Sequence, residues 1–183
     1  FPYTTLFRSG NVDEVELVLN GKTIRRQTAD KGPDSDYIPV PNGGNGKNLH
    51  FPPFTFYGVS KERGVLKAVG YHQGKKVAEY TVKTPGVPER LDITYFESGK
   101  PATKNDLLIV YVRMLDKQGV LCPVNGIPVE LSVQGGEIVG PTSYPLEAGV
   151  ASFLVRTGEI SKININATGK GFSTRKSLKV GKE

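Results

Sequence analysis

Short runs in which apolar and polar side chains alternate, separated by turn-forming pairs, constrain this sequence most strongly. Val15, Leu17 and Leu19 alternate with polar neighbours, which places the apolar side chains on one face of a half-buried strand. Asn20-Gly21 follows directly and tolerates the positive φ angles of a type I′ turn, so residues 22–26 are expected to return antiparallel to the first strand. The same period recurs along the chain, and no window has a convincing helical period. The pattern predicts an all-β fold.

Runs with this strand signal occupy most of the chain. In the first half they cover residues 14–19, 22–26, 54–57, 65–71 and 76–82. In the second half they cover residues 91–95, 107–115, 129–133, 137–139, 150–156, 162–168 and 172–180, which are enough short strands for a two-sheet sandwich. Residues 29–50 are too poor in apolar side chains to pack a core, and we expect a long loop there.

The length of 183 residues leaves room for two sandwiches of about 90 residues each. Residues 84–88, Thr-Pro-Gly-Val-Pro, place two prolines and a glycine between strand runs. Proline cannot donate to the ladder of a central strand. We therefore expect the domain boundary in this segment, with one sandwich over residues 10–85 and a second over residues 86–183.

The first nine residues, Phe1 to Ser9, read as the in-frame translation of a sequencing adapter, and we exclude them from the fold. On this interpretation the native sequence before Gly10 is missing, together with any leader that it contains.

Composition and residue types argue against several classes of function. The net charge is +6, but Lys and Arg are scattered along the chain, which indicates solvated surface rather than a face for nucleic acid. No apolar run approaches the length of a membrane span. His50, His72 and the single Cys122 are too few for a zinc site or a Cys-His nucleophile. We expect no cofactor, no metal, no nucleic-acid partner and no membrane partner, and we expect Cys122 to be a small buried hydrophobe.

Acidic residues supply no recognisable catalytic pair. Retaining glycosidases need two carboxylates about 5 to 5.5 Å apart in a cleft. Glu14 and Glu16 are expected on the solvent face of a hairpin at the edge of its sheet, and Asp116 fits a turn. We also considered calcium at the aspartates of residues 30–36, but the ligand order of an EF-hand is not met, so an ordinary polar loop is favoured. No catalytic residue is therefore expected.

Residues 51–57 form an aromatic cluster, Phe-Pro-Pro-Phe-Thr-Phe-Tyr, and carbohydrate is commonly held on aromatic faces. Phe54 and Tyr57 are the candidates for a weak sugar contact. The competing interpretation is that Phe54 and Phe56 alternate as core residues would. The chain contains no Trp, which favours the core interpretation.

Several of these motifs resemble one family. Residues 13–22, Asp-Glu-Val-Glu-Leu-Val-Leu-Asn-Gly-Lys, resemble the opening of an immunoglobulin-like domain that follows the catalytic barrel in family 2 glycoside hydrolases, especially β-galactosidases. Residues 64–71, 74–78 and 84–88 look like the next landmarks of that domain, in the same order. The second half, with landmarks at residues 110–112, 136–140, 149–151 and 155–156, is similar to the immunoglobulin-like domain that follows in these enzymes and in invasin-type adhesins.

The resemblance implies two tandem immunoglobulin-like β-sandwiches, the second of the invasin type, from the C-terminal part of a bacterial, secreted or periplasmic, β-galactosidase-like enzyme. The catalytic glutamates of that family lie in the barrel upstream, so none is carried over to this chain. The expected partner is this upstream barrel of the same polypeptide, with a homodimer contact as a further expectation. The alternatives are spacer repeats of a bacterial surface adhesin and a carbohydrate-binding module.

Overall fold

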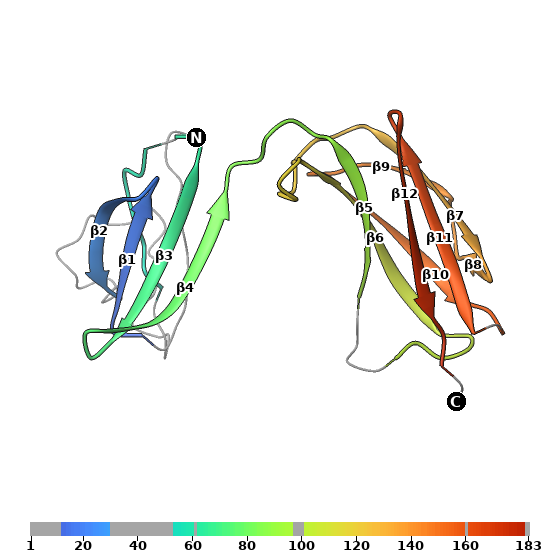
Figure 1. Ribbon diagram of the computed structural model, residues 1–183, viewed down its shortest axis with the longest axis horizontal. Helices are drawn as coiled ribbons and strands as arrows, with labels where there is room; N and C mark the ends of the chain where they lie inside the picture. Colours follow the sequence, from blue (N-terminus) through green and yellow to red (C-terminus); the bar gives the residue numbers. More distant parts are fainter. Residues whose placement is uncertain (1–11, 30–52, 61, 97–100, 160, 182–183) are drawn as a thin grey trace, which may run out of the picture. The chain divides into compact units, whose positions relative to one another are not determined.

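The computed structural model describes residues 12–29, 53–60, 62–96, 101–159 and 161–181. Within these residues the chain has twelve β-strands and no helix, and the strands form three antiparallel sheets (Figure 1). The predicted all-β, immunoglobulin-like class is confirmed. No described segment is a helix long and apolar enough to cross a membrane. The adapter-like residues 1–9, and almost all of the loop expected over residues 29–50, lie outside the described residues.

The chain divides into two compact units between Thr84 and Pro85. The first unit ends in a pair of hydrogen bonds: the Thr84 amide donates to the Gly64 carbonyl at 2.8 Å, and the Gly64 amide donates to Thr84 Oγ1 at 3.1 Å. These bonds attach the last residue of the unit to the start of one of its own strands.

The described residues of the first unit form one four-stranded sheet in the order β2-β1-β3-β4. Its strands are β1 (Glu14–Leu19), β2 (Lys22–Thr28), β3 (Val65–His72) and β4 (Lys75–Lys83). The turn of the β1–β2 hairpin has φ angles of 50° at Asn20 and 82° at Gly21, which are the positive values of a type I′ turn. The predicted hairpin is confirmed and lies at the edge of the sheet, where β2 is the edge strand and β1 also pairs with β3.

The core of the first unit forms where residues 53–60 pack against one face of this sheet. Val15 and Leu17 on β1 contact Phe54, Phe56 and Val59 there. The prediction of a strand at residues 54–57 was wrong. Phe54, Thr55 and Phe56 are all buried in succession, whereas a half-buried strand buries every second residue. The segment is held by other means, since the Gln27 side chain donates to the Thr55 carbonyl at 3.0 Å.

The second unit is a sandwich of two four-stranded sheets with the orders β5-β6-β10-β8 and β12-β11-β7-β9. Its strands are β5 (Arg90–Tyr95), β6 (Leu107–Leu115), β7 (Pro128–Gln134), β8 (Gly136–Ile138), β9 (Ser143–Pro145), β10 (Val150–Thr157), β11 (Lys162–Gly169) and β12 (Phe172–Lys179). The seven predicted strands are all present. Strand β9 was not predicted, because it has only three residues, all of them exposed, and lies at the edge of its sheet.

The inner faces of the two sheets form one apolar core. Val110 and Val112 on β6 belong to the same buried cluster as Ile163 and Ile165 on β11, and all four are 0% exposed. Burying each such side chain stabilises the fold by about 1.5–3 kcal/mol relative to exposure. The mutual covering of the two sheets is therefore the main source of stability in this unit.

Gly149 occupies a position in this sandwich that a larger residue cannot take. Its φ angle is +86°, and a Cβ added there would lie 2.1 Å from the carbonyl oxygen of Cys122. Its amide donates to the Val124 carbonyl at 2.8 Å, and its carbonyl accepts from the Met114 amide at 2.9 Å. Close packing of three backbone segments thus requires glycine here.

The substitution Gly149→Ala tests this requirement, with Gly171→Ala as the matched control. Gly171 has a φ angle of +80° but no atom within 4 Å of an added Cβ, so its substitution introduces only the backbone strain, about 1–2 kcal/mol. We expect Gly149→Ala to cost about 1–3 kcal/mol more, because the Cβ also collides with backbone. Urea unfolding followed through NMR signals of the second unit measures both. Equal losses would show that the Cys122 segment moves aside.

Candidate functional site

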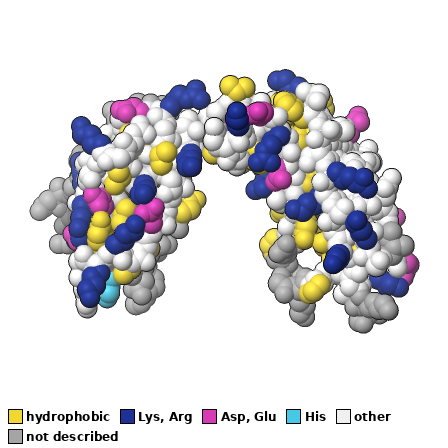
Figure 2. Space-filling model, viewed as in Figure 1, with side chains coloured by type: hydrophobic (Ala, Val, Ile, Leu, Met, Phe, Trp, Pro, Cys, Tyr) yellow, Lys and Arg dark blue, Asp and Glu magenta, His cyan; other side chains and the backbone are white. Residues whose placement is uncertain are grey.

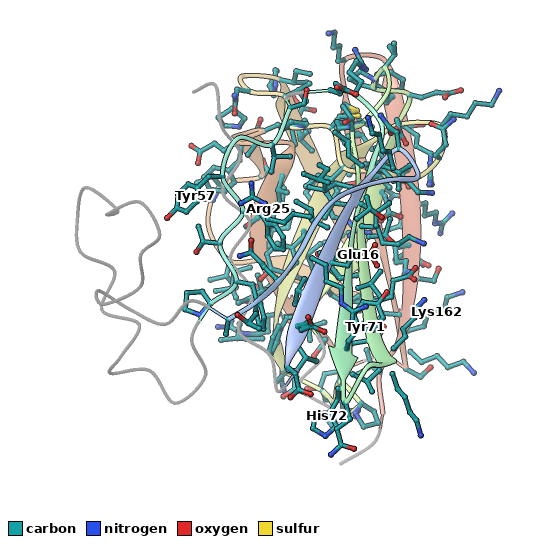
Figure 3. The ribbon with its side chains drawn as sticks, turned by 90° about the vertical axis from the view of Figure 1, so that its left-hand side faces the viewer. Glu16, Arg25, Tyr57, Tyr71, His72 and Lys162 are labelled. Atoms are coloured by element: carbon teal, nitrogen blue, oxygen red, sulfur yellow. The ribbon has the colours of Figure 1, made fainter. Side chains whose placement is uncertain are left out.

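The face of the first unit's sheet opposite its core carries a group of interacting polar side chains, which we call the polar network: Glu14, Glu16, Thr23, Arg26 and Tyr71. The two glutamates alternate with the core residues of β1 and therefore point to this face. Glu16 pairs across the strands with Arg26 on β2, and Glu14 pairs with Tyr71 on β3. Figure 3 shows Glu16 and Tyr71 on neighbouring strands.

Both carboxylates of the polar network already have donors. The Tyr71 hydroxyl donates to one oxygen of Glu16 at 2.6 Å, and the Thr23 hydroxyl donates to the other at 2.6 Å. Arg26 donates to Glu14 Oε2 from Nη2 at 2.6 Å and from Nε at 3.1 Å. The Arg26 guanidinium carbon also lies 3.8 Å from the centre of the Tyr71 ring, a cation–π contact. The network links β1, β2 and β3.

The electrostatics of the network are unlike those of a catalytic pair. The hydrogen bonds from the Thr23 and Tyr71 hydroxyls lower the pKa of Glu16 below its ordinary value. The hydrogen bond that the Tyr71 hydroxyl donates to Glu16 also raises the pKa of this hydroxyl. A glycosidase acid needs a raised pKa so that it keeps its proton near neutral pH. Glu16 is instead held as a carboxylate, and its role in this arrangement is to bind neighbouring strands.

Two further groups of charged side chains on the first unit are also paired. Glu79 on β4 lies 2.5 Å from the Lys76 ammonium and 3.0 Å from that of Lys67. His72 Nδ1 lies 3.2 Å from Asp13, whose other oxygen accepts from the Gln73 amide at 2.6 Å. This backbone bond is the main cause of the lowered pKa of Asp13. Among the described residues, no three His, Cys, Asp or Glu side chains gather as metal ligands would.

The aromatic candidates for a sugar contact have different environments. Phe54 is only 1% exposed and packs in the core of the first unit, so its ring has no face open to a sugar. Tyr57 is half-buried, and Figure 3 shows it at the outer side of the first unit. A glycan contact at Tyr57 stays a prediction.

In the second unit, Asp116 is a buried carboxylate that organises the backbone around it. It is 2% exposed, and it accepts from the Gly86 amide at 2.7 Å and from the Val120 amide at 2.8 Å. The bond from Gly86 is the main cause of the lowered pKa of Asp116. The expected turn is present, since the Gly119 amide donates to the Asp116 carbonyl at 3.0 Å. Asp116 thus ties residue 86 to the end of β6.

Cys122 lies beside this group and is 2% exposed, which confirms the predicted burial. Its sulfur is 3.8 Å from the Gly86 carbonyl oxygen and 3.7 Å from that of Val120. Burial raises the pKa of the thiol, so Cys122 stays protonated and unreactive.

Sequence reasoning identified Glu14 and Glu16 but not the partners that define their chemistry. Arg26 lies opposite Glu16 and could have been placed there from the hairpin register. Thr23 lies opposite Val18, beyond a register shift between Leu17 and Val18, so its bond to Glu16 does not follow from a regular hairpin. Tyr71 lies 55 positions after Glu16 in the chain, and no local sequence pattern predicts that these two residues pair.

Comparison with known proteins shows where this fold and these residues belong. Residues 9–78 match a protein family described as a domain of unknown function, DUF4982. The chain is 30% identical over 129 residues to a β-galactosidase of Rhizobium radiobacter, covering 69% of this chain and 92% of that protein. It is also 30% identical over 159 residues to a β-galactosidase of Thermoanaerobacter pseudethanolicus, covering 80% of this chain and 20% of that enzyme.

Among solved structures, a β-glucuronidase from glycoside hydrolase family 2 has the same fold. The TM-score is 0.74 at 22% sequence identity, and the match covers 98% of this chain and 19% of the other.

The chain therefore belongs to glycoside hydrolase family 2, in the group of the β-galactosidases and β-glucuronidases. It corresponds to an accessory region in the C-terminal part of such an enzyme and spans about a fifth of the length of the Thermoanaerobacter relative.

Tyr71→Phe tests the polar network directly. The substitution removes one hydrogen-bond donor from the Glu16 carboxylate, so we expect the pKa of Glu16 to rise towards its ordinary value. A pH titration of the Glu16 side-chain carboxyl by NMR measures the change. Tyr111→Phe, in the second unit, is the control and should leave that titration unchanged. A Glu16 pKa unaffected by Tyr71→Phe would mean that the hydroxyl does not donate to it.

Asp116→Asn tests the buried carboxylate. Because the pKa of Asp116 is lowered in the folded chain, its ionised form stabilises the fold above the ordinary value of 3.8, and this stabilisation is lost as the pH falls through the lowered pKa. We expect Asp116→Asn to lower the melting temperature at pH 7, and this difference to shrink below pH 3.8. Glu130→Gln, at an exposed position of β7, is the control. A loss of melting temperature that is the same at every pH would contradict the stabilising role of the ionised Asp116 carboxylate.

Proposed function

We propose that this chain is a supporting region of a β-galactosidase-like enzyme that removes sugars from the non-reducing ends of oligosaccharides or glycans. The catalytic barrel of that enzyme would lie in the upstream part of the same polypeptide. The observation that carries the proposal is the match to the Thermoanaerobacter β-galactosidase over 80% of this chain, which is more than either unit contains. The likeness therefore includes residues of both domains.

The described side chains support a structural role. The carboxylates of the polar network are ionised or ion-paired, and Asp116 is used to hold backbone amides. The second unit has a continuous apolar core between its sheets. These are the properties of rigid modules, which can position or brace a catalytic domain without taking part in its chemistry.

The two related β-galactosidases are the reason for proposing a β-galactosidase-like enzyme rather than a β-glucuronidase. Both β-galactosidases are 30% identical to this chain, whereas the β-glucuronidase structure, at 22% identity, supports the fold alone. The sugar itself would be selected in the barrel, so these domains leave the linkage preference open.

We extend the proposal to a bacterial, secreted or periplasmic enzyme, supported by the bacterial sources of the two relatives and by the family resemblance. A homodimer contact through these domains stays a prediction. Of the two aromatic candidates for the carbohydrate-binding alternative, Phe54 is buried in the core and Tyr57 stays a candidate contact. Detection of the enzyme in periplasmic and culture-medium fractions of the source organism would test the location.

Recovery of the upstream coding sequence from the source sample tests the proposal as a whole. We expect it to encode a barrel with two catalytic carboxylates, about 5 to 5.5 Å apart if the enzyme is retaining. The complete polypeptide should hydrolyse a nitrophenyl β-galactoside, and the 183-residue chain alone should not. Further immunoglobulin-like repeats or a surface anchor upstream would favour the adhesin instead. Activity on the corresponding glucuronide alone would show that the enzyme is a β-glucuronidase instead.

A further inference from the structure

The outer face of the β5-β6-β10-β8 sheet carries a row of apolar side chains. The Phe96 amide donates to the Ile109 carbonyl at 2.9 Å, Ile109 pairs with Leu154, and the Val139 amide donates to the Leu154 carbonyl at 2.8 Å. These contacts place the four residues side by side across the sheet. Leu107 lies two positions from Ile109 on the same face of β6. We call the five residues, Phe96, Leu107, Ile109, Val139 and Leu154, the apolar band.

The apolar band is open to solvent. Phe96 is 61% exposed, Leu107 54%, Ile109 44% and Val139 38%, while Leu154 is half-buried. Figure 2 shows hydrophobic side chains gathered over β5 and β6 in the second unit. Isolated exposed apolar residues are ordinary, but a contiguous group on one face marks an interaction surface.

The other sheet of the same sandwich shows what a solvent-facing surface looks like in this domain. On its outer face Arg175 pairs with Asn166, and Asn166 pairs with Ser132. The neighbouring row is also polar, and its members are Ser173, Thr168, Glu130 and Ser143. An antiparallel sheet with one wet face normally alternates in this way. The apolar band departs from this alternation, and packing of the sandwich core does not require it.

The charges beside the apolar band are neutralised within the chain. Arg156 forms an ion pair with Glu137 on the row next to it, and Arg113 lies 2.5 Å from Asp92 further along the same face. A surface without excess charge is a poor fit for nucleic acid or for phosphate groups. Apolar side chains surrounded by paired polar groups are typical of a protein–protein contact.

We propose that the apolar band is covered by another domain of the same polypeptide. The inference rests on the proposed function, in which most of the enzyme lies outside this chain: the match covers only 20% of the Thermoanaerobacter relative. A stable contact between separate molecules usually needs about 20–30 residues on each side, far more than the band provides. A covalently attached partner acts at an effective concentration in the millimolar range, so a small apolar contact is enough to hold it.

Cysteine labelling tests this proposal. Cys122 is the single cysteine of the chain and is buried, so Ile109→Cys introduces one accessible thiol in the middle of the apolar band. Ser173→Cys, on the exposed outer face of the other sheet, is the matched control. The rate of maleimide labelling is measured for both variants, once in the 183-residue chain and once in the complete polypeptide. We expect Ile109→Cys to react at least about tenfold more slowly in the complete polypeptide, and Ser173→Cys to react at the same rate in both.

Equal rates for Ile109→Cys in the two proteins would overturn the proposal. So would labelling of the 183-residue chain that slows as its concentration rises, because the apolar band would then be covered by a second copy. Hydrolysis of the nitrophenyl galactoside by the same complete polypeptide is recorded in parallel. An active enzyme with an unprotected band refutes the inference alone, whereas an inactive protein without a barrel refutes the proposed function.

Discussion

Every sheet in this chain has to bury one face, and the way each does so determines the rest of its structure. In the second unit two sheets cover each other, and residues such as Val110 and Ile163 are completely removed from water. In the first unit one sheet is covered by residues 53–60, whose consecutive buried side chains fill the space over β1. Hydrophobic burial is the dominant favourable term in both cases. Most polar side chains are left facing solvent, and the buried Asp116 is accommodated because backbone amides donate to it.

The environments of these acidic side chains explain why the domains are suited to support rather than catalysis. A catalytic carboxylate is useful when its environment leaves its proton poised near neutral pH. Here the environments act in the opposite direction, because Glu16 receives two hydroxyl donors and Asp116 receives backbone amides. Each interaction fixes the position of a strand or a turn. The chain uses its acids to make the modules rigid, and rigidity is what a larger enzyme needs from a bracing domain.

The sequence predicted those features of the fold that depend on near neighbours. The hairpin at Asn20 and Gly21 follows from the backbone freedom of two adjacent residues, and the strands of the second unit follow from alternation. Features that depend on contacts between distant parts of the chain could not be predicted from the sequence. Residues 54–57 look like a strand until the sheet that buries them is known. Strand β6 is apolar on both faces, so its sequence is typical of a fully buried strand, and only the topology shows that Leu107 and Ile109 face outward.

The attachments on either side of Pro85 bear on how such modules are exchanged between proteins. Thr84 is bonded to Gly64 in the first unit, and Gly86 is bonded to Asp116 in the second, so a single residue lies between the two anchored positions. A recombination point one residue later than Gly86 would leave this bond to Asp116 to whichever residue the new neighbour places at position 86, and a proline there could not donate it. Shuffling that preserves the second sandwich must therefore keep a residue with a backbone N–H at position 86, directly before the downstream domain. The heritable unit of the second sandwich begins before its first strand.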